Sequence, residues 1–197
     1  MLARRFSSAW RDRASISFAK SESGDHENAG ALWILFMNAD GTVASHQKIN
    51  TSLGGFTGTS GNNQFGGALA FLGDFNADDK PELAVSEAPK SAFHIVSLNN
   101  DGTVAAQNTI DHYGLTSVSN SDKFGSALAS MGDFNGNGAY FIAVGSPTYQ
   151  RDGTEWGCDG VECGGAVDIL EMNPDLSVAS TQRISATQGG FLGTLEA

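Results

Sequence analysis

The sequence predicts an all-β protein built from repeated units of four short antiparallel strands. Short apolar runs alternate with turn residues, and the 25 glycines against 4 prolines indicate many tight turns. A hairpin-like segment occurs in three copies, and a strand-loop-strand segment occurs in two copies between them. Together the two segments repeat about every 60 residues, which is the size of a β-propeller blade with long loops.

The hairpin segment consists of an alternating apolar run, an Asn-x-Asp turn and a second run that ends in isoleucine. Its copies are LWILFMNADGTVASHQKI at 32–49, FHIVSLNNDGTVAAQNTI at 93–110 and VDILEMNPDLSVASTQRI at 167–184. A tight Asp-Gly turn between two alternating runs is typical of a β-hairpin. Leu176 replaces the turn glycine in the third copy, so we expect a less ideal turn there.

The strand-loop-strand segment occupies 64–89 and again 123–147, with an offset of 59 residues between the copies. Each copy begins with a Phe-Gly pair, at 65–66 and at 124–125, and carries Gly-Asp-Phe-Asn where its polar loop starts. A buried ring and a close backbone approach are needed where blades meet. We therefore expect the Phe-Gly pairs to serve packing.

The repeat divides the chain into a partial first blade (16–60), a second blade (61–114), a third blade (115–190) and the truncated start of another repeat (191–197). Residues 1–15 are rich in arginine and lack the apolar core of a secretory signal, so we expect a disordered or spurious stub. Because a propeller needs roughly 4–8 blades to close, we expect either a piece of a longer protein or the assembly of several copies.

The third blade is longer than the second because of an insertion at 149–163, which contains the two cysteines, Cys158 and Cys163. Two thiols are too few for a structural zinc site. They could form a small local disulfide in an oxidising compartment or remain a free pair.

The first polar loop has the ligand pattern of a calcium site. Asp74, Asn76 and Asp78 occupy loop positions 1, 3 and 5, Glu82 occupies position 9, and the carbonyl of Lys80 lies at position 7. Alternate residues of a tight loop can direct their oxygens at one centre, and calcium takes roughly 6–8 oxygen ligands. An EF-hand is excluded, because position 6 is not glycine, position 12 is not glutamate, and strands are expected on both sides.

These residues resemble the FG-GAP repeat of integrin α-subunit β-propellers and of many microbial extracellular proteins. The family pattern is Phe-Gly, a strand, a Gly-Asp-x-Asn/Asp-x-Asp-Gly loop, a second strand and a hairpin, and the likeness covers roughly residues 16–197. It implies an incomplete integrin-α-type propeller in which the five loop groups named above hold calcium. The loop departs from the pattern at Asp79, which replaces glycine, at Pro81, and at Glu82, which replaces aspartate.

The second polar loop is a weaker candidate for calcium. Asp133, Asn135 and Asn137 match positions 1, 3 and 5, but Phe141 stands at position 9 and cannot be a ligand. Only one carboxylate remains, and calcium affinity depends on ligand charge. We therefore favour Asx-type turns, in which these side chains accept hydrogen bonds from their own backbone.

No catalytic constellation is visible, so we expect no enzyme activity. The four histidines share no metal-ligand spacing, and neither a nucleophile elbow nor a glycosidase pair of carboxylates stands out. His94 occupies the place of Trp33 and Asp168 in the other hairpins, a variable position that we expect to be exposed.

The net charge of −11 argues against nucleic-acid binding, since no basic stripe exists to replace phosphate counterions. No apolar stretch approaches the ~20 residues that span a bilayer, so no membrane insertion is expected within this chain.

The resemblance implies a non-catalytic, calcium-supported propeller segment outside the cell or on its surface, for adhesion or for binding a protein or glycan ligand. Further blades would come in cis or by oligomerisation. Two alternatives stay open: an accessory propeller domain of a secreted hydrolase, and a gene fragment without a function of its own.

Overall fold

The computed structural model describes residues 14–19, 30–58, 64–111, 113–115, 121–149, 164–186 and 188–190. The stub before residue 14, the insertion from 150 to 163 with both cysteines, and the truncated repeat at 191–197 lie outside the described residues. The elements are β1 (Ala14–Ala19), β2 (Ala31–Met37), β3 (Val43–Ile49), β4 (Leu69–Gly73), β5 (Glu82–Glu87), the 3₁₀ turn η1 (Ala88–Lys90), β6 (Ala92–Leu98), β7 (Val104–Asp111), β8 (Ala127–Gly132), β9 (Tyr140–Ser146), β10 (Ala166–Met172) and β11 (Val178–Ser185).

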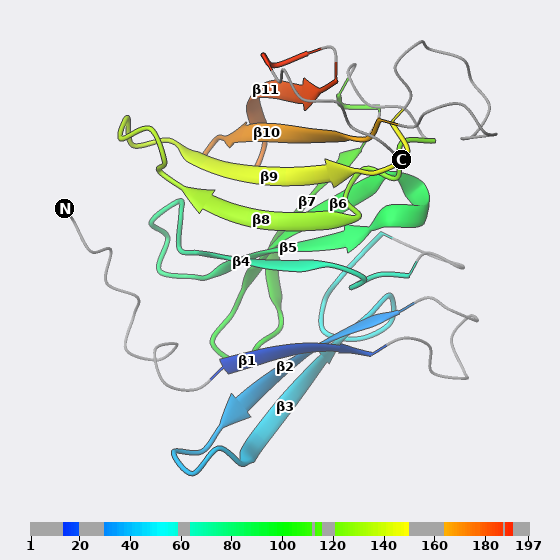
Figure 1. The fold of residues 1–197 in the computed structure, drawn as a ribbon. Helices are drawn as coiled ribbons and strands as arrows, with labels where there is room; N and C mark the ends of the chain where they lie inside the picture. Colours follow the sequence, from blue (N-terminus) through cyan, green and yellow to red (C-terminus); the bar gives the residue numbers. More distant parts are fainter. Residues whose placement is uncertain are drawn as a thin grey trace.

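The strands form three antiparallel sheets that follow one another along the chain. The first sheet has the order β1-β2-β3, the second β4-β5-β6-β7 and the third β8-β9-β10-β11. Figure 1 shows the sheets side by side in sequence order, from blue through green to orange. The all-β class and the four-stranded antiparallel units predicted from the sequence are confirmed. No helix in the described part of the chain is long and apolar enough to cross a membrane.

The three predicted hairpins form as β2–β3, β6–β7 and β10–β11, and their turns share one geometry. In the first, the Gly41 amide donates to the Asn38 carbonyl and the Asn38 amide to the Thr42 carbonyl, at 3.0 and 2.7 Å. Asp40 Oδ1 accepts from the amide and the hydroxyl of Thr42, at 2.9 and 2.6 Å, and these bonds lower the pKa of Asp40. The bonds recur around Asp101 and Asp175, so the Asn-x-Asp pattern determines the turn locally.

The third turn is the less ideal one that the sequence predicts. Leu176 has a φ of +70°, where Gly41 has +83° and Gly102 has +82°. A left-handed backbone costs a residue with a Cβ roughly 1–2 kcal/mol. Leu176 is 5 % exposed and packs in the core between the second and third sheets. Burial of a leucine contributes roughly 1.5–3 kcal/mol, so tertiary packing offsets the strain.

Two hydrophobic cores lie between the sheets, and the second sheet contributes one face to each. Every residue of β5 and of β6 is buried. On β6, Phe93 and Ile95 belong to the core shared with the third sheet, whereas Val96 and Leu98 belong to the core shared with the first. Alternate side chains of a strand point to opposite faces, so this sheet is covered on both sides.

The Phe-Gly pairs serve packing, as predicted. Phe65 and Phe124 are 2 % and 0 % exposed, and the Phe124 ring lies 5.5 Å from the Phe93 ring. Gly125 has a φ of +88°, and a Cβ placed on it would lie 2.7 Å from the carbonyl oxygen of Ala92. Glycine is therefore required there, because the third sheet approaches the backbone of β6 directly.

Candidate calcium-binding loops

The first candidate loop joins β4 to β5, and the second joins β8 to β9, as Figure 1 shows at one end of each sheet. Both loops have the same backbone path. Ala77 and Asp79 have φ values of +61° and +64°, where Gly136 and Gly138 of the second loop have +75° and +87°. Asp79 therefore keeps the left-handed conformation of the glycine that it replaces.

Side chains of the first loop hold that backbone path through Asx-type hydrogen bonds. Asp74 Oδ1 accepts from the Asp78 amide at 3.0 Å, and Asp74 Oδ2 accepts from the Asp79 amide at 3.2 Å. The Asp78 amide also donates to Asn76 Oδ1 at 3.2 Å, and the Lys80 amide donates to Asp78 Oδ1 at 2.9 Å. The alternation of polar residues therefore brings Asp74, Asn76 and Asp78 around one short stretch of backbone.

Glu82 is the unusual member of the predicted set. Its side chain is fully buried, and its Oε2 accepts a hydrogen bond from the Phe75 amide at 3.2 Å. Ser97 lies opposite on β6, and its hydroxyl is close enough to lower the pKa of Glu82, although neither Glu82 Oε1 nor Ser97 Oγ forms a hydrogen bond of ordinary geometry among the described residues. Burial raises the pKa of Glu82 to about 7, the contacts with Ser97 and Phe75 oppose this rise, and the charges of Asp78 and Asp74 add to it.

The carboxylates of the first loop influence one another without forming a closed cluster. Within the described part of the chain, no group of three or more His, Cys, Asp and Glu side chains is arranged to hold a metal. Asp78 Oδ2 instead pairs with the ammonium of Lys80 at 3.4 Å, where both side chains are exposed.

The oxygen donors nevertheless suit calcium by their chemistry. Carboxylate and amide oxygens are the ligands that this hard cation prefers, and each carboxylate oxygen can accept a second partner. The unpartnered, buried Oε1 of Glu82 is the group that a cation would satisfy, because an unpaired buried acceptor costs roughly 1–3 kcal/mol. The residues present therefore fit calcium.

The second loop keeps the same turns without a buried carboxylate. The Gly138 amide donates to Asp133 Oδ2 at 3.0 Å, the Asn137 amide to Asn135 Oδ1 at 3.2 Å, and the Ala139 amide to Asn137 Oδ1 at 2.8 Å. These are the predicted Asx-type bonds. Phe141, at the position of Glu82, is 7 % exposed and packs its ring 4.7 Å from Phe134.

The expectation that His94 is exposed is wrong. His94 is 1 % exposed, with its Nε2 2.9 Å from Glu87 Oε2 and its Nδ1 3.0 Å from Thr109 Oγ1. Glu87, equally buried, also pairs through Oε1 with the ammonium of Lys90 at 3.0 Å. The position is covered because it faces the core between the first and second sheets, where the ring of Phe56, from the segment after β3, lies 5.0 Å away.

The equivalent position of the third sheet carries a buried ion pair that sequence reasoning missed. Asp168 accepts from Nε and Nη2 of Arg183 at 2.9 and 2.8 Å, and Asp122 lies 3.8 Å from Nη1. The Arg183 guanidinium also lies over the Tyr149 ring at 4.3 Å. The hairpin alignment could have revealed this pair, because Asp168 and Arg183 face each other across the ladder as His94 and Thr109 do.

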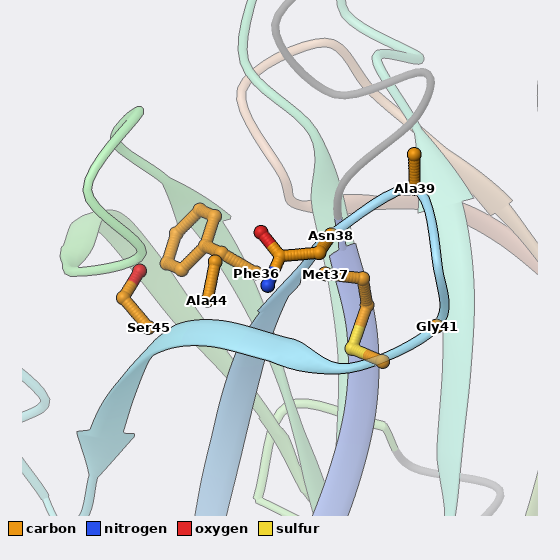
Figure 2. A pocket seen from close by; sticks show the side chains of 7 residues that line it. All are labelled: Phe36, Met37, Asn38, Ala39, Gly41, Ala44 and Ser45. Carbon is orange, nitrogen blue, oxygen red and sulfur yellow. The ribbon is translucent and has the colours of Figure 1, made fainter.

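A pocket of about 850 Å³ lies at the turn end of the β2–β3 hairpin. Figure 2 shows its lining side chains on the end of β2, the turn and the start of β3: Phe36, Met37, Asn38, Ala39, Gly41, Ala44 and Ser45. None of these side chains is titratable, so the pocket offers no acid, base or charged metal ligand.

No protein-family model matches the chain, and no curated protein sequence matches it. The likeness to FG-GAP repeats therefore stays a prediction from the motifs.

Proposed function

We propose that this chain is a non-catalytic, calcium-supported segment of a β-propeller similar to FG-GAP repeats, acting outside the cell in adhesion or ligand binding. The observation that carries the proposal is Glu82, a fully buried carboxylate with an unpartnered oxygen beside the aspartates of a tight loop. A protein that buries a charge without a partner loses stability. A bound cation would remove this penalty at the point where the loop joins two buried strands.

In this proposal Asp74, Asn76, Asp78, the Lys80 carbonyl and Glu82 hold the ion. Calcium supplies positive charge to clustered carboxylates. Asx-type bonds already order the loop, and the energy of calcium binding would add to the folding energy. The loop thereby stabilises the hairpin between the first two strands of the second sheet and the core that these strands share with both neighbours.

Thermal unfolding with calcium and with a chelator tests the proposal. Extracellular modules bind calcium at ~10⁻⁴–10⁻³ M. At about 10 mM calcium and a Kd of about 1 mM, linkage contributes about 1.4 kcal/mol, which raises the Tm by roughly 3–6 °C for a chain of this size. Asp74→Asn removes one charge and keeps an oxygen that can accept the loop amides, so it should reduce the shift without unfolding the loop.

The second loop provides the matched control. Asp133→Asn makes the same change at the equivalent position and should leave the calcium shift at the parent value. The proposal is wrong if calcium leaves the parent Tm unchanged. It is equally wrong if Asp74→Asn and Asp133→Asn give the same shift as the parent, because the metal would then act elsewhere.

A further inference from the structure

Each of the two outer sheets has one apolar face that is uncovered, whereas the equivalent face of the middle sheet packs against a neighbouring sheet. On the middle sheet, Phe93 and Ile95 face the third sheet, while Val96 and Leu98 face the first. The repeat places a corresponding residue at each of these positions on the outer sheets. On each outer sheet the residues of one face are buried and those of the other are exposed or half-buried, which identifies a face that no described sheet covers.

The third sheet exposes the face that corresponds to the Phe93 and Ile95 face of the second sheet, opposite to its own face in the shared core. We call this the tail face; it comprises Ala129, Met131, Phe134, Ala143, Val167 and Ile169. Phe134 is 57 % exposed, whereas its equivalent Phe75 is 7 % exposed. Val167 is 41 % exposed, whereas its equivalent Phe93 is fully buried. The tail face thus keeps the apolar chemistry of an internal interface without its cover.

The first sheet exposes the face that corresponds to the Val96 and Leu98 face of the second sheet. We call this the head face; it comprises Leu35, Met37 and Val43. The equivalents on the second sheet, Val96, Leu98 and Val104, pack in the core with the first sheet, and those on the third, Leu170, Met172 and Val178, pack in the core with the second. Val43 is 49 % exposed, and Leu35 and Met37 are half-buried.

The chain itself therefore joins a tail-type face to a head-type face twice, in its two internal cores. We propose that the tail face of one chain binds the head face of a second copy of this chain, in the manner of those cores. A head-to-tail contact is heterologous, so it closes into a ring when the rotation allows and otherwise extends into a chain of copies. The inference rests on the propeller part of the proposed function and is independent of calcium.

Sedimentation velocity on the 20.5 kDa chain tests this inference over a range of concentrations. The parent should form complexes of two or more copies. Val167→Glu, at a position that is already exposed, should weaken self-association at least tenfold by placing a charge in the tail face. Leu35→Glu should do the same in the head face. Leu53→Glu, at a turn residue that is 51 % exposed and lies on neither face, is the matched control and should associate like the parent.

Mixing the two defective variants identifies the mode of binding. One intact head and one intact tail remain in the mixture, so Val167→Glu and Leu35→Glu should together form a one-to-one dimer that neither forms alone. A symmetric tail-to-tail contact would instead leave Leu35→Glu fully associating, and that result would overturn the inference.

A parent chain that stays monomeric up to its solubility limit would also overturn it. This failure is distinct from a failure of the calcium proposal, which is measured by the Tm shift. Circular dichroism of each variant checks the fold, and Phe134→Asp on the exposed loop replaces Val167→Glu if the latter unfolds.

Discussion

Glu82→Gln is expected to stabilise the calcium-free protein at neutral and alkaline pH. Glutamine keeps the shape of the side chain and an oxygen that can accept the Phe75 amide, but it carries no charge to bury. The pKa of Glu82 is raised from 4.5 to about 7 in the folded protein. The folded state therefore favours the protonated carboxyl, and the parent loses stability as the pH rises from the unfolded pKa through the folded one.

The magnitude follows from these two pKa values, with 1.36 kcal/mol for each unit of difference. The variant should exceed the parent in free energy of unfolding by roughly 3 kcal/mol at pH 8, by roughly 2 kcal/mol at pH 6 and by less than about 1 kcal/mol at pH 5. The gain disappears in acid because the parent carboxyl is then neutral in both states.

Urea unfolding of parent and variant between pH 5 and pH 8, in the presence of a chelator, measures this difference. A difference in free energy of unfolding that stays constant across the pH range would refute the reasoning, because it would mean that Glu82 has the same pKa in the folded and unfolded states. Calcium at about 10 mM should narrow the difference at pH 8 by up to about 1.4 kcal/mol, since the cation favours the ionised carboxylate that the variant lacks.

Five further substitutions test the loops, the contact between sheets and the buried ion pair, each by the free energy of unfolding in urea. Asp79→Gly should stabilise by about 1 kcal/mol by relieving a left-handed backbone, and Gly138→Asp should destabilise by a similar amount; effects of the same sign would contradict this. Gly125→Ala should destabilise by more than ~2 kcal/mol because its Cβ meets a carbonyl of β6, whereas Gly132→Ala, with open space around the added Cβ, should cost only about 1 kcal/mol. Arg183→Met should cost roughly 3–5 kcal/mol at pH 7 by removing the guanidinium that pairs with the buried carboxylate of Asp168; a loss below about 1 kcal/mol would mean that the ion pair contributes little.

The strands and hairpins could be predicted from the sequence because their causes are local. The Asn-x-Asp turn forms its hydrogen bonds within five residues, as at Asn38 to Thr42, and the alternation of apolar residues specifies which side of each strand is buried. The polar loops follow the same rule, since Asp74 and Asp133 both bond to amides a few positions ahead. Such local patterns can be recognised in the sequence because they do not depend on a neighbouring sheet.

The burial of individual polar groups could not be predicted, because it depends on which sheet lies opposite. Trp33, His94 and Asp168 occupy one position of the repeat, yet Trp33 is half-buried on the uncovered head side while the other two are buried. Glu82 likewise matched a ligand position in the sequence, but its raised pKa follows from desolvation between packed sheets.

The sequence by itself determined the repeat and the hairpin turns, which follow from short-range backbone and side-chain geometry. Only the tertiary structure decided that the middle sheet is covered on both faces and the outer two on one. That asymmetry explains the buried carboxylate at Glu82 and the exposed Phe134 ring and Val167 side chain of the tail face. Solvent is excluded from a side chain only where two sheets pack together, so the sequence of one four-stranded unit does not specify which of its faces is buried.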